Sequence, residues 1–452
     1  MSTVLFHNAR IVTEDGVVDG NILVENGKIA EITDRDVEAA NRVDCGGKYL
    51  FPGVIDTHVH FREPSPNEQE DFASGTMSAA AGGVTCVIEH PLDVPPVLDA
   101  ESFEGKAKAI EKKAYIDYGL WGGVTGHNLD KLTELRDKGV FAYKAFMCAS
   151  DPLFPMVSDG ELLEAMKKIA DMGGMIGLHA ENDGIISYNK THYSAAEWTN
   201  GTHGKMRPVV AELEAVGRAI LLANATGAKL HILHMGIWEG AELVKKAKKD
   251  GIDVTAETCP HYLCLNEGLF EKKGADAKCC PPLRDEAHMR KLWDYVLDGT
   301  IDMIVSDHSP YTPEEKARGR ENMLLAPPGI TGVQTGLQVM LSEACGRRGM
   351  PLTQLSMLMS TNAAKRFGLY GTKGAIRAGF DADFALVDME KSWVINSSDL
   401  YYKNKNSAFA GYEGTGKAVA TYVRGKCVWS EKEGFIQGAG FGRLLKHFHK
   451  TT

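Results

Sequence analysis

Two histidines, His58 and His60, stand two residues apart in the segment GVIDTHVHFREP, at the end of an apolar run. On a β-strand, residues i and i+2 point to the same face, so the two imidazoles would converge on one point. Imidazole nitrogens bind divalent metals, which makes the pair a candidate for part of a metal site. A His-x-His pair alone is equally compatible with two surface or core histidines, so its meaning depends on the rest of the chain.

Four further ligand-type side chains each end an apolar run of their own: Lys144 in VFAYKAFM, His179 in MIGLHAEN, His234 in KLHILHMG and Asp307 in DMIVSDHSP. Taken singly, each has an ordinary explanation. Satisfied core histidines are common, a lysine can extend its ammonium to the surface, and an aspartate can cap a following helix. Their joint occurrence favours a site for two divalent metal ions, of zinc or a similar metal. His231, three residues before His234, would face the opposite side and is interpreted as structural.

The apolar runs alternate with helical patterns through the middle of the chain, which predicts an α/β protein. Eight strands are expected, at Val54–His60, Thr85–Glu89, Tyr118–Gly122, Ala142–Phe146, Met175–His179, Leu230–His234, Val254–Thr258 and Met303–Asp307. Helical patterns follow most of them, including Glu161–Met172, Val209–Ala225, Gly240–Lys249 and Ala287–Leu297. Eight such units with near-continuous apolar strands predict a closed (β/α)8 barrel of the TIM type. In such a barrel the carboxyl ends of the strands share one mouth, where active sites lie.

Both chain ends alternate apolar and polar residues between Gly, Asp and Asn turns, which is typical of β-strands. We therefore expect a small β-sandwich domain built from residues 1–52 and 374–452, with the barrel over residues 53–373. The Gly-rich and then basic tail, Gly438–Thr452, is predicted to serve packing or subunit contact.

Composition excludes several classes of partner. The 452 residues are 44% hydrophobic and 24% charged, with a net charge of −10, and they contain no long basic run. These values are typical of a soluble globular protein and argue against nucleic acid as a partner. No apolar run reaches the length of a membrane span, and the first residues lack a secretory pattern. Nine cysteines at irregular spacings are expected to be reduced thiols in the cytoplasm.

Lys144 needs its own explanation, because an ammonium beside two cations would be repelled. Burial and nearby positive charge both lower the pKa of a lysine. A neutral amine can react with carbon dioxide to form a carbamate, which is anionic and carboxylate-like. Such a group is able to bridge two metals, which would make Lys144 a ligand.

At this point the chain closely resembles the cyclic amidohydrolases, which include dihydroorotases, hydantoinases, dihydropyrimidinases and allantoinases. The resemblance runs from the first strands to the tail. It rests on HVHFREP, AYKAFM, LHAEN, LHM, TCPHYL, KCCPPLRD, SDHSP, TNAAKRFGL and GFDADF. It implies that one metal is held by His58, His60, carbamylated Lys144 and Asp307, and the other by Lys144, His179 and His234. Zinc is the expected metal, with cobalt, iron or manganese as alternatives.

The resemblance also implies a reaction. A hydroxide shared by the two metals would attack the carbonyl of a small cyclic amide, and one metal would stabilise the oxyanion. Asp307 would take the proton of the hydroxide and deliver it to the leaving ring nitrogen. By the same resemblance the protein is expected to be a homo-oligomer, most often a tetramer.

Departures from the patterns of the family narrow the substrate. Dihydroorotases bind a substrate carboxylate through an arginine, which is present as Arg62, and through an asparagine and a histidine. Leu92 and Tyr311 stand in place of the latter two. Hydantoinases and dihydropyrimidinases usually carry a tyrosine where Ala149 stands. Both comparisons argue against those two substrate classes.

The allantoinase pattern fits better. Its Glu-Met-Pro-Leu-Asn stretch parallels Glu89 to Asp93, and its Ser-Asp-His-Ser-Pro stretch parallels Ser306 to Pro310. The resemblance implies hydrolysis of allantoin to allantoate. Asp93 replaces an asparagine and Cys280 replaces a serine, so another cyclic amide remains an alternative, as does, less favoured, a non-catalytic relative. The expected substrate-binding residues are Arg62, Leu92, Cys280, Ser309 and Gly329.

Overall fold

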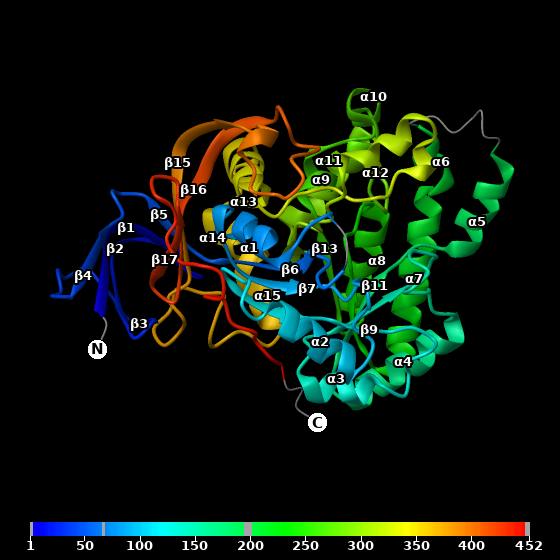
Figure 1. Cartoon of the computed structure of the whole chain (residues 1–452), viewed down its shortest axis with the longest axis horizontal. Helices are drawn as coiled ribbons and strands as arrows, with labels where there is room; N and C mark the ends of the chain where they lie inside the picture. The colour runs from blue at the N-terminus through cyan, green and yellow to red at the C-terminus, as the bar shows by residue number, and fades with distance from the viewer. Residues whose placement is uncertain (1–2, 66–67, 194–200, 448–452) are drawn as a thin grey trace.

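The computed structural model describes residues 3–65, 68–193 and 201–447, and a parallel barrel occupies the middle of the chain (Figure 1). Its strands are β6 (Val54–Val59), β7 (Val84–Glu89), β8 (Asp117–Leu120), β9 (Gly122–Gly123), β10 (Tyr143–Phe146), β11 (Met175–His179), β12 (Lys229–Ile232), β13 (Val254–Thr258) and β14 (Met303–Ile304). They pair in parallel as β6-β7-β8 and β9-β10-β11-β12-β13-β14. Trp121 alone separates β8 from β9, which together form the third predicted strand. The predicted barrel is confirmed.

The barrel closes where its first strand meets the segment that follows its last. Val59 pairs in parallel with His308, and the backbone N–H of His60 donates to the carbonyl of His308 at 2.8 Å. This closure brings the two ends of the barrel sequence together. It therefore places the histidines of the first strand beside Asp307.

Three predicted strands end earlier than expected. β6 ends at Val59, β12 at Ile232 and β14 at Ile304, so His60, His234 and Asp307 lie just beyond them. The φ angles of His234 and Asp307 are 38° and 44°, in the left-handed region that extended strands do not use. The chain thus turns sharply at these residues while their side chains stay at the barrel mouth.

Helices cover the outside of the barrel (Figure 1). The long ones are α1 (Phe72–Ala81), α2 (Ala100–Ile110), α3 (Leu132–Lys138), α4 (Asp159–Asp171), α5 (Asp183–His192), α7 (Val209–Thr226), α8 (Trp238–Lys249) and α11 (Glu286–Leu297). α4 shows why they form: Ser158 and Glu161 make a capping box at its start, and its buried residues Leu162, Ala165, Met166 and Ile169 lie on one face. The four helices predicted from periodicity are present, with small shifts at their ends.

Shorter helical segments complete the loops and the last crossover. They are α6 (Thr202–Met206), α9 (Pro260–Cys264), α10 (Leu269–Lys273), η2 (Gly274–Ala277), α12 (Pro313–Ala317), η3 (Arg318–Arg320), η4 (Met323–Leu325), α13 (Gly336–Met340), η5 (Leu341–Arg347), α14 (Leu352–Ser356), η6 (Met357–Thr361), α15 (Asn362–Arg366) and η7 (Ser397–Asp399). Within the described ranges, no helix combines the length and apolar character that crossing a membrane requires.

Strands from both chain ends form a second unit beside the barrel (Figure 1). They are β1 (Thr3–Val12), β2 (Val17–Glu25), β3 (Lys28–Thr33), β4 (Asn41–Asp44), β5 (Tyr49–Pro52), β15 (Phe384–Val394), β16 (Glu413–Val423), β17 (Lys426–Ser430) and β18 (Gly434–Phe435). They pair into one nine-stranded sheet in which β5 joins β1 to β15. Phe6 contacts the rings of Phe384 and Tyr422 edge-on, so both ends of the chain contribute to one core.

A buried ion-pair cluster joins this unit to the barrel. The ammonium of Lys373 lies 2.8 Å from a carboxylate oxygen of Asp117 in β8 and 2.5 Å from one of Asp383. Arg424 pairs with the other oxygen of Asp117. The tail reaches the same strand, since the N–H of Leu445 donates to the carbonyl of Tyr118 at 2.7 Å. The described part of the tail therefore packs on the barrel, and residues 448–452 of the predicted contact segment lie outside the described residues.

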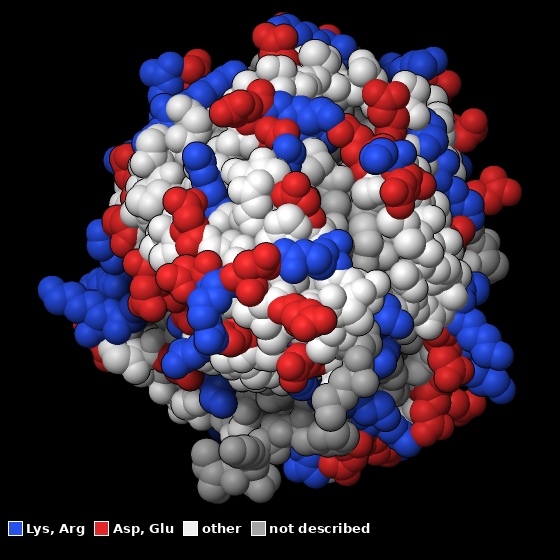
Figure 2. All heavy atoms as spheres, turned by 90° about the vertical axis from the view of Figure 1, so that its left-hand side faces the viewer, with Lys and Arg blue, Asp and Glu red and all other residues white. Residues whose placement is uncertain are grey.

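The face of the molecule on the side of β1 to β3 carries mixed charge. Figure 2 shows Lys and Arg side chains interspersed with Asp and Glu side chains across this face. Such a surface lacks the single-sign field that draws a polyanion.

Candidate metal centre

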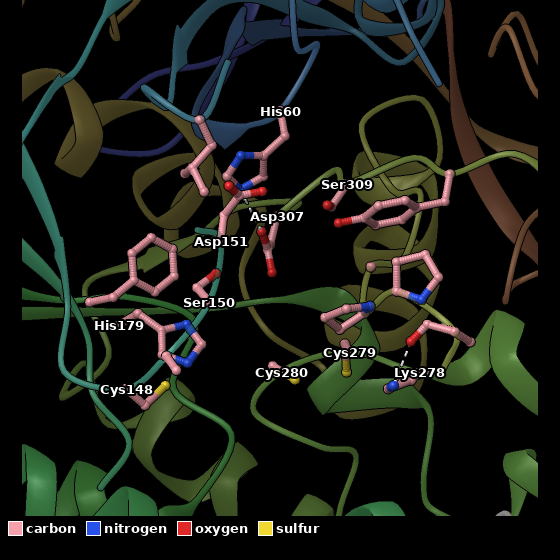
Figure 3. Close-up of a pocket in the computed structure, with 18 of the residues that line it drawn as sticks. His60, Cys148, Ser150, Asp151, His179, Lys278, Cys279, Cys280, Asp307 and Ser309 are labelled. Carbon is pink, nitrogen blue, oxygen red and sulfur yellow. Dashed lines mark hydrogen bonds and ion pairs between the residues drawn. The ribbon is translucent and has the colours of Figure 1, made fainter. Parts of the chain in front are cut away.

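A pocket of about 630 Å³ opens at the carboxyl ends of the barrel strands. Every residue that the sequence nominated for metal or substrate binding lines it: His58, His60, Arg62, Leu92, Lys144, His179, His234, Cys280, Asp307, Ser309 and Gly329. Figure 3 shows His60, His179 and Asp307 pointing into the same space, with Ser309 and Cys280 at its edge. Residues that are far apart in the sequence therefore meet at one place.

His58 is oriented by a carboxylate that the sequence analysis did not nominate. Its Nδ1 pairs with Oε1 of Glu257, at the end of β13, and Oε2 of Glu257 lies 3.0 Å from Nε2 of His231. An ionised carboxylate only accepts hydrogen bonds, so Nδ1 of His58 carries a proton, and in the neutral imidazole Nε2 is the nitrogen with the lone pair. Burial works to raise the pKa of Glu257, but His58 and His231 outweigh it and lower that pKa.

Asp307 faces these lone pairs. Its Oδ1 lies 3.1 Å from Nε2 of His58 and 3.3 Å from Nε2 of His60. Burial works to raise the pKa of Asp307, but His58, His60 and His234 together lower it strongly. Burial also lowers the pKa of His60 to about 3, which keeps that imidazole neutral. Nε2 of His58 thus faces an ionised oxygen across 3.1 Å, and a cation held between the two would be stabilised by both.

The other side of the centre is built in the same way. Nε2 of His179 lies 2.7 Å from Oε2 of Glu181, and Arg207 pairs with the same oxygen. This leaves Nδ1 of His179 as the nitrogen with a lone pair. The ring of His234 lies 4.6 Å from that of His179, and Nδ1 of His234 has no hydrogen-bond partner among the described residues. Burial lowers the pKa of both imidazoles, so both are in the neutral form that binds metals.

Lys144 is buried between the two sides without a counter-charge. No carboxylate forms an ion pair with it within the described ranges, and its Nζ lies 4.7 Å from the centre of the Phe146 ring. Burial lowers the pKa of Lys144 to about 8. An unpaired buried ammonium is unfavourable, which is the physical condition expected for a lysine that is modified to an anion.

The nominated substrate residues form the rim of the pocket. The guanidinium of Arg62 donates to the hydroxyls of Ser309 and Tyr311 at 2.8 and 2.7 Å. Gly329 packs so closely that a Cβ there would lie 2.3 Å from the carbonyl oxygen of Ser309, which restricts the position to glycine. Leu92 and Cys280 line the same pocket.

Sequence reasoning missed the carboxylates that orient the imidazoles. Glu257 is the last residue but one of the predicted strand Val254–Thr258, and Glu181 follows His179 by two residues, so both lay within segments already singled out. The signal available in the sequence was an acidic residue in or next to the end of a predicted strand, where it could orient a histidine ligand. Arg207 lies in an otherwise unremarked turn after α6, and nothing in the sequence marks its contact with Glu181. His231, interpreted as structural, lies outside the pocket and supports Glu257.

The donor set fits a divalent transition metal. Neutral imidazoles, each held by a carboxylate or aimed into the pocket, and an ionised aspartate are the ligands that such metals prefer. The opposed lone pairs of His58 and Asp307 indicate the point where a cation would be bound.

The chain matches known proteins over nearly its whole length. Residues 49–428 match the model of the amidohydrolase family. The chain is 41% identical over 447 residues to an allantoinase of Deinococcus radiodurans, covering 98% of each chain. It is 41% identical to an allantoinase of Rubrobacter xylanophilus over 439 residues, covering 96% of each chain. Its fold is similar to that of the L-hydantoinase (dihydropyrimidinase) from Arthrobacter aurescens, with a TM-score of 0.96, 35% identity and coverage of 99% and 100% of the two chains.

Replacement of Glu257 by glutamine tests the role of the orienting carboxylates. A glutamine has one acceptor oxygen, so either His58 or His231 loses its partner. We expect Glu257→Gln to weaken metal binding by about 10- to 100-fold, as measured by competition with a chelator. Glu343→Gln is the matched control, because Glu343 is a buried, ion-paired carboxylate that does not line the pocket. Unchanged affinity in Glu257→Gln would contradict the orienting role.

Proposed function

The chain belongs to the amidohydrolase family, and we propose that it is a metal-dependent hydrolase that opens the hydantoin ring of allantoin to give allantoate. The observation that carries this proposal is the 41% identity to two allantoinases over at least 96% of each chain. The reaction adds water across an amide: a C–O bond forms at the ring carbonyl carbon, the ring C–N bond breaks, and the nitrogen takes up a proton.

Six side chains of the pocket are proposed to hold two divalent ions, with zinc as the expected metal. His58, His60 and Asp307 would hold one ion, His179 and His234 would hold the other, and Lys144 as a carbamate would contact both. When bound, such a pair lowers the pKa of a water molecule and polarises a carbonyl. Nδ1 of His58 and Nε2 of His179 stay with Glu257 and Glu181, which fixes the opposite nitrogens toward the pocket.

Asp307 is proposed to move the proton. Its carboxylate lines the pocket beside the imidazoles and is ionised, so it has a free acceptor oxygen for a proton of the attacking water. Delivery of that proton to the leaving ring nitrogen completes the cleavage. The sharp turn at Asp307 directs its side chain toward both the imidazoles and the substrate space.

The rim of the pocket favours a neutral ring over a carboxylate-bearing one. Leu92 and Tyr311 line the pocket at the two positions where dihydroorotases carry an asparagine and a histidine. Arg62 is already engaged with two hydroxyls, those of Ser309 and Tyr311. A ring carboxylate would therefore be incompletely neutralised on entering the pocket. Allantoin, which carries a neutral ureido arm, needs only hydrogen-bond partners.

The assembly and setting are also proposals. We propose a homotetramer in the cytoplasm.

A panel of cyclic amides tests the substrate. With purified, metal-loaded protein, we expect kcat/KM for allantoin to exceed that for dihydroorotate, hydantoin and dihydrouracil by at least about 100-fold, because partners left unpaired in a polar site discriminate strongly. Product formation is followed directly as allantoate. Turnover of dihydroorotate or a simple hydantoin in the absence of allantoin turnover would overturn the substrate assignment while leaving the reaction class in place.

Asp307→Asn tests the proton-transfer role. The amide keeps an oxygen as a ligand but cannot accept the proton, so we expect kcat for allantoin to fall by about 10²- to 10⁴-fold. Metal analysis should still find partial occupancy. Asp294→Asn, a change of an exposed aspartate on α11, serves as the control and should retain the wild-type rate. A wild-type kcat in Asp307→Asn would remove this residue from proton transfer.

The Lys144 carbamate is tested by chemistry at the nitrogen. Protein equilibrated with isotopically labelled bicarbonate should show a carbamate carbon by NMR. We expect Lys144→Ala to lose this signal and to bind fewer than two metals per chain, because the anion that spans them is gone. Lys432→Ala, an exposed lysine, should keep both properties. Full metal content and full activity in Lys144→Ala would exclude the bridging role.

A further inference from the structure

One side of the metal pocket is formed by residues 323–329, a segment that we call the pocket wall. It has little regular structure beyond the short turn η4, and it contains two consecutive prolines, Pro327 and Pro328. Residues 324–329 all line the pocket. Carbonyls outside helices and sheets need hydrogen-bond donors from elsewhere, and prolines reduce the number of N–H groups nearby. The wall therefore depends on donors from other parts of the protein.

Two buried lysines supply these donors. Nζ of Lys278 donates to three wall carbonyls, those of Met323, Leu324 and Ala326, at 2.8, 3.3 and 2.5 Å. Nζ of Lys316, in α12, donates to the wall carbonyls of Pro327 and Gly329 at 3.1 and 2.7 Å and to that of Ala275 in η2 at 3.0 Å. Three acceptors match the three N–H groups of an ammonium, so both lysines are fully used. Figure 3 shows Lys278 at the edge of the pocket with a hydrogen bond from its ammonium group.

The two ammonium groups are buried without an ion-pair partner. Their side chains belong to residues that are 4% and 6% exposed, and among the described residues no carboxylate lies within ion-pair distance of either Nζ. Burial lowers the pKa of Lys278 to about 8 and that of Lys316 to about 7, the direction expected for such a charge. An apolar side chain would pack there at less cost. The hydrogen bonds to the wall are therefore what these lysines contribute.

Gly329 connects the two lysines to the substrate site proposed above. Its carbonyl accepts from Lys316, and its N–H donates to the carbonyl of Lys278 at 2.8 Å, so both of its backbone groups are held. Within the described ranges Lys278 lines the pocket, whereas Lys316 does not. Lys316 can therefore act on a bound substrate only through the residues that it holds.

We propose that Lys278 and Lys316 are positioning residues for the substrate, which hold the pocket wall in the shape that the cyclic amide contacts. The inference rests on the proposed function and adds to it a pair of residues that sets the affinity for the substrate. The proposed metal ligands all lie outside the wall. Loosening of the wall should therefore weaken substrate binding and leave the metal centre intact.

Lys316→Met tests the proposal, because methionine keeps an unbranched side chain and removes all three donors. With allantoin we expect KM to rise by about 10-fold and kcat to stay within about threefold of the wild type, since a loss of binding shared by the ground and transition states appears in KM. Lys316→Gln keeps two N–H donors and should restore part of the loss. Lys229→Met is the control: this exposed lysine donates to the carbonyl of Gly173 at 3.1 Å, and the variant should keep the wild-type KM.

Hydrogen exchange measured by mass spectrometry separates a local effect from a global one. We expect faster amide exchange within residues 321–331 of Lys316→Met, with wild-type exchange in β10 and β11 and wild-type metal content. If Lys316→Met does not fold, Lys316→Gln and Lys278→Gln take its place and should shift KM and exchange in the same direction. Wild-type KM together with wild-type exchange in the folded variants would overturn the proposal. Failure of the wild-type protein to hydrolyse allantoin would instead overturn the proposed function, and the exchange measurement would still decide whether the lysines hold the wall.

Discussion

The closure of the barrel is the constraint on which the centre depends. A single register brings the backbone of His60 against the carbonyl of His308, and in that register the two histidines of the first strand meet the aspartate that follows the last. About 250 residues separate these groups in the chain, so only the return of the sheet on itself makes them neighbours. A shift by one residue in this pairing would turn one set of side chains away from the mouth.

The centre that results gathers buried imidazoles and an ionised carboxylate around one space, an arrangement that a bound cation would stabilise. Glu257 and Glu181 each accept from the far side of a histidine, so that the near side presents a lone pair. His234 and Asp307 are in the left-handed region of backbone space, which is seldom adopted by residues with side chains. Strained backbone and unpaired donors at one place are typical of sites where the surrounding fold imposes a functional geometry. Burial lowers the pKa of Lys144 in this centre, although Asp307 and Glu257 work to raise that pKa.

The β-sheet unit supports the barrel from the opposite end of the same strands. Lys373 and Arg424 neutralise Asp117 at the start of β8, and the tail adds hydrogen bonds along that strand. Removing one partner from such a buried cluster typically costs about 3–5 kcal/mol, so the cluster ties the positions of the two units together. The ends of the chain thus stabilise the part of the barrel that is remote from the pocket, and the loops at the mouth are left free to build the substrate rim.

The sequence by itself determined which groups could bind metal and what reaction class they suit. The period of two in a strand places His58 and His60 on one face, and apolar runs that end in His179, His234 and Asp307 predict that these residues share a barrel mouth. The alternation of apolar runs and helical patterns likewise predicted where the strands and helices lie. The predicted strands ending at His234 and Asp307 were too long, because the chain leaves the extended conformation before these residues.

Only the tertiary structure decided how the groups face one another. The pairings of Glu257 with His58 and of Arg207 with Glu181, and the stacking of His90 on His58, join different strands or a strand and a loop. Local periodicity governs the direction of a side chain within its own element. Contacts between elements follow from barrel closure and register, which no short stretch of sequence encodes.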